Sequence, residues 1–295
     1  MTSASEARAG GSRALVWSAL FALYVIWGST YYAMRVALRV LPPYLMGASR
    51  FSIAGLLLFA VLRLRGAALP SAKQWLAAGV VGILLLVMGN GFVALAERSV
   101  DSGTAATVVA TVPLWSAAIG RLWGERLQGR ELLGLCFGFA GIVVLNRSAA
   151  FALHGVDALA ILAAPAAWAF GSVWSRRLPM PSGLMSAATQ MIVGGAVMFG
   201  VALVRGERLQ APLNASAVGA IAYLIVFGSL IAFSAYAFLL RAVRPVIATS
   251  YAYVNPVVAL AIGAVLGGER LTLDKAGACA LTVSGVLVVT LGRER

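Results

Sequence analysis

Apolar residues follow one another in ten long blocks along this chain, and they do not alternate or form a single helical stripe. Each block has about 15 to 24 residues, close to the length that an α-helix needs to cross the hydrocarbon core of a bilayer. Because backbone groups cannot stay unpaired in lipid, we expect each block to form a transmembrane helix. The blocks are Leu15–Val36, Tyr44–Leu62, Trp75–Ala96, Gly103–Trp123, Leu132–Asn146, Val156–Trp174, Gly183–Val204, Ala217–Leu240, Pro245–Gly267 and Leu273–Leu291.

The second half of the chain repeats features of the first half. Residues 118–120 and 261–263 both read Ala-Ile-Gly, and Pro113 and Pro256 precede them at the same distance in the middle of their blocks. Two halves, residues 1–147 and 148–295, would each hold five helices. Since five is odd, the second half would enter the membrane from the opposite side. The pattern predicts an all-α membrane protein with two inverted five-helix repeats, which is typical of transporters.

The composition agrees with a membrane protein and changes how the charge is interpreted. The chain is 61% hydrophobic and only 11% charged, whereas soluble domains carry about 25% charged residues. In a soluble chain a net charge of +13 would suggest nucleic acid, but here the arginines lie between apolar blocks. The N-terminal tail and the connections on its side carry more Lys and Arg than the opposite connections. The positive-inside rule therefore predicts that both termini are cytoplasmic, and we expect no nucleic-acid partner.

Polar and aromatic side chains recur at helical spacing inside several blocks. Such faces gain nothing from lipid, so they line a path or bond to neighbouring helices, and the sequence leaves both roles open. Together they predict a largely apolar, aromatic cavity with scattered hydroxyls and amides, which suits a small amphiphilic metabolite. The candidate substrate-binding residues are Trp27, Tyr31, Asn90, Thr107, Thr111, Trp115, Trp168, Ser172, Phe233, Tyr236, Tyr251 and Asn255.

Arg50 is the one charge clearly inside an apolar block. An intramembrane charge is costly and is by default a functional candidate. It could meet a carboxylate of the substrate, or it could extend to the membrane surface or bond to backbone carbonyls. We include Arg50 among the candidate substrate-binding residues.

The two mid-block prolines are candidate hinges. Pro113 and Pro256 each remove an amide donor and leave a carbonyl four residues earlier without its helical partner. Each proline could mark a hinge at the substrate site or a fixed packing kink.

The acidic residues are absent from the middle of the blocks. All ten fall in connections or at block ends, and Glu125 and Glu269 are expected to anchor their loops near the neighbouring arginines, with a gating role as the alternative. Ion-coupled transporters normally use a buried carboxylate, so facilitated transport is the simpler prediction. One His and two Cys without metal spacing, and no phosphate-binding loop, predict no metal, cofactor or ATP hydrolysis.

These features together resemble the EamA family of the drug/metabolite transporter superfamily. The resemblance covers about residues 15–291 and rests on Pro113 and Pro256 with the Gly-Glu pairs that follow them, on Trp27-Gly28-Ser29 and on Arg50-Phe51. It implies a ten-helix inverted-repeat fold and a metabolite carrier of the bacterial inner membrane. Many members export amino acids, including aromatic ones. Residues 168–172 depart from the first-half motif, because two residues separate Trp168 from its Gly-Ser.

We therefore expect a secondary transporter, not an enzyme, that exports amino acids or similar metabolites by alternating access. A multidrug or other metabolite exporter of the same fold is the main alternative, although the absence of a membrane-embedded Glu disfavours a drug pump. A polytopic membrane enzyme or a channel is the alternative from another class. The expected partners are a small-molecule substrate and the lipid bilayer, and the oligomeric state cannot be read from the sequence.

Overall fold

A computed structural model describes residues 2–98, 105, 108–126, 128–145 and 155–267, with a few positions between 277 and 288. Within these residues the regular structure is helical, and no strand is present. The helices are α1 (Thr2–Ala37), α2 (Pro43–Leu64), α3 (Ala72–Gly82), η1 (Ile83–Asn90), α4 (Gly91–Ala96), α6 (Val112–Leu122), α7 (Gly129–Leu145), α8 (Gly155–Ser175), α9 (Leu184–Val204), α10 (Ala215–Tyr223), η2 (Leu224–Ile231), α11 (Ala232–Ala242), α12 (Pro245–Ala248) and α13 (Tyr251–Gly267).

Five helical stretches are long and apolar enough to cross a membrane, by length and composition. A shorter apolar stretch, Leu159–Ser175, lies within α8. The five stretches coincide with five of the apolar blocks, which supports the all-α membrane class. More than half of the last block, from Leu273 to Leu291, lies outside the described residues. The five are Arg13–Ala37, Pro43–Leu64, Ala72–Ala96, Leu184–Val204 and Ala215–Ala242.

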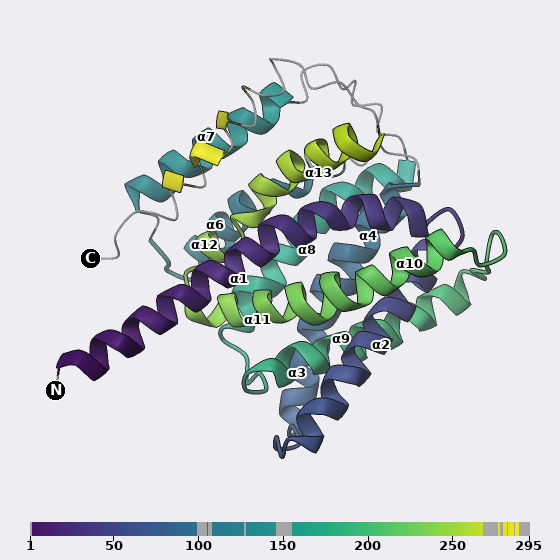
Figure 1. Ribbon diagram of the computed structural model, residues 1–295, viewed down its shortest axis with the longest axis horizontal. Coiled ribbons are helices and arrows are strands. Elements are labelled where there is room, and N and C mark those ends of the chain that lie inside the picture. Colours follow the sequence, from purple (N-terminus) through teal and green to yellow (C-terminus); the bar gives the residue numbers. More distant parts are fainter. Residues whose placement is uncertain are drawn as a thin grey trace.

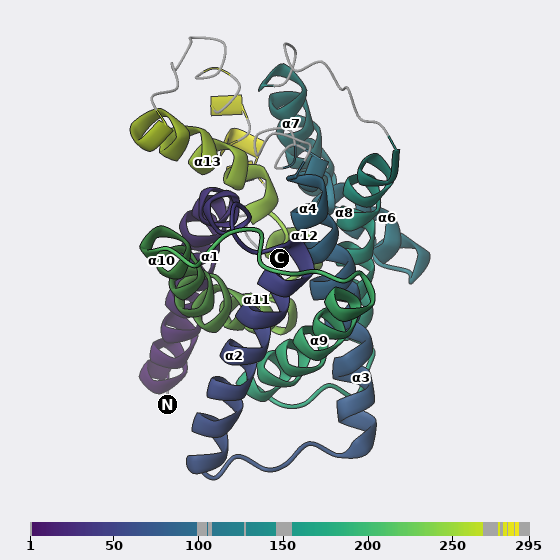
Figure 2. The same cartoon turned by 90° about the vertical axis from the view of Figure 1, so that its right-hand side faces the viewer.

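Helices from the two halves of the chain pack against one another (Figures 1 and 2). The long helix α1 contacts α10, α11 and α13, and α2 runs beside α9 along much of its length. Helix α8 contacts α4, α6 and η1. The interior of the bundle is therefore built from both halves, and any space left there is lined by both.

Glycines allow two of these contacts to be close. A Cβ atom on Gly28 of α1 would lie 2.5 Å from Cβ of Val258 in α13, and one on Gly171 of α8 would lie 2.3 Å from Leu85 in η1. Both distances are shorter than real carbon atoms tolerate. These two residues are the glycines of the Gly-Ser pairs that correspond between the halves. Their shared role is to let helices of the two halves approach closely.

Two long helical stretches contain a wider, π-helical segment at corresponding places. The segment η1 joins α3 to α4, and η2 joins α10 to α11, so each stretch is continuously helical. A π-helix leaves backbone carbonyls less regularly paired than an α-helix does, and it is frequent at functional sites. Both segments contribute residues to the interior of the bundle, as described below.

The fourth and ninth blocks are interrupted near their prolines. A turn at residues 110–111 precedes α6, so Pro113 lies in the first helical turn, where its missing amide costs nothing. In the ninth block a turn at residues 249–250 separates α12 from α13, and Pro256 lies inside α13. The expectation of a proline within a continuous helix therefore fits Pro256, whereas Pro113 begins a new helix.

Candidate functional site

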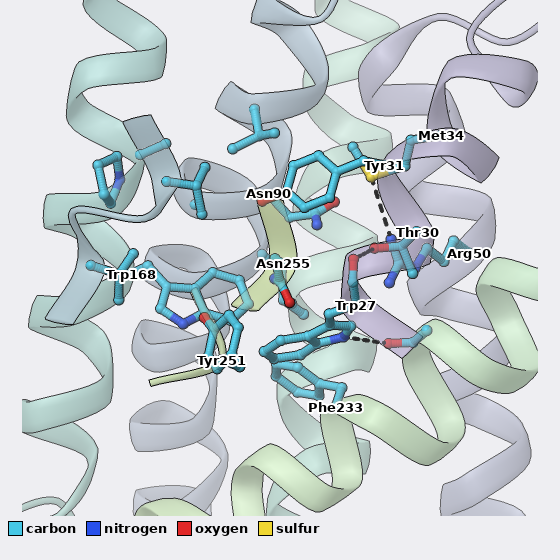
Figure 3. Close-up of a pocket in the computed structure, with 18 of the residues that line it drawn as sticks. Trp27, Thr30, Tyr31, Met34, Arg50, Asn90, Trp168, Phe233, Tyr251 and Asn255 are labelled. Atoms are coloured by element: carbon cyan, nitrogen blue, oxygen red, sulfur yellow. Dashed lines mark hydrogen bonds between the residues drawn. The ribbon is translucent and has the colours of Figure 1, made fainter. Parts of the chain in front are cut away.

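A partly open cavity lies in the interior of the bundle (Figure 3). Its walls come from α1, α2, η1, α4 and α6 of the first half and from α8, η2, α11 and α13 of the second. Eight of the candidate residues line it, namely Trp27, Tyr31, Arg50, Asn90, Trp168, Phe233, Tyr251 and Asn255. The structure thus brings together side chains that lie up to 228 positions apart in the sequence, between Trp27 and Asn255.

Four aromatic side chains, Trp27, Trp168, Tyr236 and Tyr251, pack together beside this cavity, and we call them the aromatic cluster. The ring centroids of Trp27 and Tyr251 are 4.6 Å apart, and those of Trp27 and Trp168 are 5.5 Å apart with an edge-to-face angle of 85°. Edge-to-face pairs of this kind stabilise by about 0.5–1.5 kcal/mol beyond the burial of their area. The cluster is a rigid apolar surface on one side of the cavity.

Hydrogen bonds fix the rings of the aromatic cluster in place. Trp168 Nε1 donates to the Tyr236 hydroxyl at 2.9 Å, and that hydroxyl also lies 2.6 Å from Ser172 Oγ. Trp27 Nε1 donates to the carbonyl of Gly228 at 3.1 Å. Gly228 belongs to η2, so the π-helical geometry supplies the acceptor that holds Trp27. Each indole N–H of the cluster therefore has an acceptor within the protein.

The Arg50 side chain forms part of the opposite wall. It is 2% exposed, and its Nε donates to Ser229 Oγ at 2.8 Å. The guanidinium carbon lies 4.7 Å from the ring centre of Phe51, which is a cation–π distance. The side chain does not reach the surface, so the expected alternative of extension to the membrane surface is wrong for this conformation.

Four other candidates lie outside the cavity wall. Tyr236, a member of the aromatic cluster, does not line the cavity, and Ser172 hydrogen-bonds to its hydroxyl. Thr111 uses its hydroxyl on the carbonyl of Val108 at 2.7 Å, and Trp115 is 44% exposed. The turn at residues 110–111 precedes α6, so Thr111 and Trp115 do not share one regular helical face. Thr107 itself lies outside the described residues.

Thr30, Met34, Phe51 and Gly228 also line the cavity, and sequence reasoning did not select them. Thr30 and Met34 follow Trp27 at positions i+3 and i+7, so extending the aromatic face of the first block would have found both. Gly228 carries no such signal, because its role depends on its carbonyl.

Ion pairs between the halves lie beyond the aromatic cluster. Trp168 is seven residues before the end of α8, a distance of about 10 Å along the helix, and Arg177 follows that end. Arg177 pairs with Glu125 at 3.8 Å, and Arg244 pairs with the buried Glu131 at 3.0 Å. Glu125 was expected to anchor near its neighbouring arginine, and its partner instead comes from the other half. Glu269 lies outside the described residues.

Comparison with known proteins gives consistent matches over nearly the whole chain. The model of the EamA-like transporter family matches residues 15–147 and again residues 156–291. The uncharacterized inner membrane transporter YedA of Escherichia coli K12 is 45% identical over 279 residues, which cover 94% of this chain and 91% of YedA. An uncharacterized transporter of Archaeoglobus fulgidus is 24% identical over 94% of this chain and 99% of its own. A protein of known crystal structure superposes with a TM-score of 0.76 at 25% identity, over 94% of this chain and 96% of the other.

Proposed function

The chain belongs to the EamA-like transporter family and is a membrane transporter, and on this premise we propose that it exports amino acids. Aromatic and other hydrophobic amino acids are the foremost substrates of this proposal, and similar small metabolites are its extension. Transport would occur by alternating access, in which the two halves rock about a central site.

The observation that carries this proposal is the cavity shared by both halves. Trp27 and Asn90 come from the first half, and Trp168 and Tyr251 come from the second. A site at the meeting point of two halves is accessible from alternate sides when the halves move against each other. The aromatic cluster offers a flat apolar surface of the kind that binds a hydrophobic side chain.

We further propose ten membrane-spanning helices in two inverted repeats, residues 1–147 and 148–295, with both termini in the cytoplasm. The similarity to YedA, which is named an inner membrane transporter, supports the same location here. The doubled match of the family model supports the division into halves. A cationic drug is a poorer substrate for this cavity, because Arg50 lies in its wall.

The test is efflux from liposomes that contain the purified protein. The liposomes are loaded in turn with each of a panel of labelled amino acids, and efflux is followed first without an ion gradient and then with a proton gradient. We expect saturable efflux of hydrophobic amino acids without a gradient. Efflux that requires the gradient would contradict facilitated transport, and no efflux of any amino acid would contradict the proposed substrate class.

Paired tryptophan variants connect the flux to the cavity. Trp168→Ala removes an indole from the cavity wall, so we expect at least a tenfold loss of efflux. Trp115→Ala removes an indole that is 44% exposed and does not line the cavity, so efflux is expected to stay near the native rate. Equal rates in the two variants would contradict the assignment of the site.

A further inference from the structure

The guanidinium of Arg50 has unused hydrogen-bonding capacity inside the cavity wall. Of its donors, Nε is taken by Ser229, and Nη1 has only the sulfur of Met34 at 3.9 Å. Among the described residues, the ion pairs are Arg177–Glu125, Arg205–Glu207 and Arg244–Glu131, and Arg50 belongs to none of them. A guanidinium has five N–H donors, and a buried charge without a counter-ion costs several kcal/mol. The wall therefore holds a cation that lacks an anion.

Two amide oxygens of the same cavity also lack partners. Asn90 Oδ1 and Asn255 Oδ1 are buried, and neither has a hydrogen-bond partner among the described residues. Both residues line the cavity, and in the view of Figure 3 Asn255 lies between Trp168 and Arg50. A buried acceptor left without a donor costs about 1–3 kcal/mol. The cavity therefore presents unused acceptors as well as unused donors.

The remaining wall is mostly apolar, with the hydroxyl-bearing side chains of Thr30, Tyr31 and Tyr251, and none of the lining residues is acidic. Trp27, Trp168 and Tyr251 of the aromatic cluster line the cavity together with Phe233. A complementary ligand needs an anionic group for Arg50, an N–H donor for the two asparagines and an apolar group for the rings. An amino acid zwitterion has all three, whereas an amine without a carboxylate would face Arg50 with like charge.

We propose that Arg50 binds the carboxylate of the transported molecule, and that Asn90 and Asn255 accept hydrogen bonds from its ammonium group. The side chain of the substrate then packs against the aromatic cluster. Ser229 is a positioning residue in this arrangement, because its hydroxyl occupies Nε and leaves the two terminal nitrogens of Arg50 for the carboxylate. This inference rests on the proposed function and specifies which groups of the substrate are recognised.

A purely structural role of Arg50 is the competing explanation. The guanidinium also packs against Gly228, since a Cβ on that glycine would lie 2.7 Å from Arg50 Nη2, and it could simply hold η2 against α2. In that case the transporter would not distinguish substrates by their carboxylate. The two explanations therefore differ in ligand selectivity, which the native protein reports without any substitution.

The first experiment measures inhibition of L-phenylalanine efflux from liposomes that contain the native protein. The competitors are L-leucine, L-phenylalaninamide, which lacks the carboxylate charge, and 3-phenylpropanoate, which lacks the ammonium group. We expect both modified compounds to inhibit at least about tenfold more weakly than free L-phenylalanine, as loss of one charged hydrogen-bonding pair implies. Equal inhibition by L-phenylalaninamide would overturn the role of Arg50 and leave the proposed function standing. No efflux of L-phenylalanine or of any other amino acid would contradict the proposed function, and this assignment with it.

The second experiment assigns the selectivity to the residue. In Arg50→Gln we expect the preference for L-phenylalanine over its amide to fall to about one, and in Arg50→Lys to remain in part. Arg39→Gln, which changes an exposed cation in the turn after α1, is the matched control and keeps the native preference. If Arg50→Gln is recovered folded and keeps the native preference, Arg50 does not bind the carboxylate. If Arg50→Gln does not fold, the Arg50→Lys variant is measured instead. A native preference of Arg50→Lys for L-phenylalanine over its amide would show that the paired N–H donors of the guanidinium do not bind the carboxylate.

Discussion

At the scale of single residues, Tyr236 shows how a buried hydroxyl holds the site together. It accepts a hydrogen bond from Trp168 and contacts Ser172, while its ring packs against Trp27 and Tyr251. The hydroxyl does not line the cavity, yet it determines how one indole of the wall is oriented. Its contribution is therefore to positioning.

Tyr236→Phe is expected to destabilise the protein by about 1–3 kcal/mol, because it leaves the buried N–H of Trp168 without an acceptor. Thermal unfolding in detergent measures this change. The matched control is Tyr24→Phe, which removes a hydroxyl bonded to Ser250 Oγ at 2.9 Å in a partly buried place and is expected to cost less. A larger loss for the control than for Tyr236→Phe would contradict this description of the aromatic cluster.

Glu97, the residue after the third apolar block, has a buried carboxyl group. Both of its carboxylate oxygens are buried without a hydrogen-bond partner among the described residues. Burial raises the pKa of Glu97 to about 8, and the charge of Arg35 opposes this shift only in part. The folded protein therefore keeps a proton on Glu97 at pH 7, where the unfolded chain, with an ordinary glutamate pKa of about 4.3, has lost it.

As the pH rises from the pKa of Glu97 in the unfolded chain to its pKa of about 8 in the folded protein, the free energy of unfolding therefore falls. Above that pH, Glu97 causes no further fall. We expect the native melting temperature to fall between pH 5 and pH 9 by more than that of Glu97→Gln. The two proteins should melt at similar temperatures at pH 5, and the variant should melt higher at pH 9. A constant difference at both pH values would show that Glu97 ionises normally.

At the scale of elements, the π-helical segments and the close glycine contacts determine how the helices meet. The segment η2 supplies the carbonyl that fixes Trp27 and the hydroxyl that fixes Arg50, and η1 supplies Asn90. Close approach of α1 to α13 brings Trp27 of α1 into contact with Tyr251 of α13. The site depends on these local departures from regular packing.

Gly28→Ala tests the close contact of α1 with α13. The added Cβ would lie 2.5 Å from Val258, so the helices must separate, and we expect a destabilisation of about 1–3 kcal/mol with lower efflux. Gly200→Ala in α9 is the matched control, since its Cβ would have no atom within 4 Å, and we expect it to gain about 0.5–1 kcal/mol. Thermal unfolding of both variants decides, and a neutral Gly28→Ala would contradict tight packing at this contact.

At the scale of the whole molecule, two ion pairs outside the cavity wall connect the two halves of the chain. Arg177–Glu125 and Arg244–Glu131 join segments of the two halves. In the proposed cycle these pairs separate when the halves rock, and the opposite end closes. Separating Arg244 from Glu131, which is 1% exposed, would leave a buried carboxylate without its partner. The pair therefore opposes separation of the two halves until other contacts replace it.

Much of this arrangement could be predicted from the sequence, because the length and polarity of a block are direct consequences of the bilayer. Periodicity along the helices selected eight of the nineteen residues that line the cavity, including Trp27 and Asn255. It failed at Trp115, because a turn without a strong signal shifted the register of the helix before Pro113. It also missed Gly228 and the hydrogen bond of Ser229 to Arg50, since these arise from a π-helical segment and from the approach of a distant arginine, which no local pattern encodes.

The proposed function requires the substrate to pass through the cavity between the halves. Blocking that cavity tests this requirement. Thr30 lines the cavity and is 6% exposed, so Thr30→Cys places a thiol there, in a background with both native cysteines replaced by serine. Efflux of L-phenylalanine is measured before and after reaction with a small thiol reagent. We predict that modification stops efflux and that excess L-phenylalanine slows the modification. Efflux at an unchanged rate from fully modified protein would show that the substrate does not pass through this cavity.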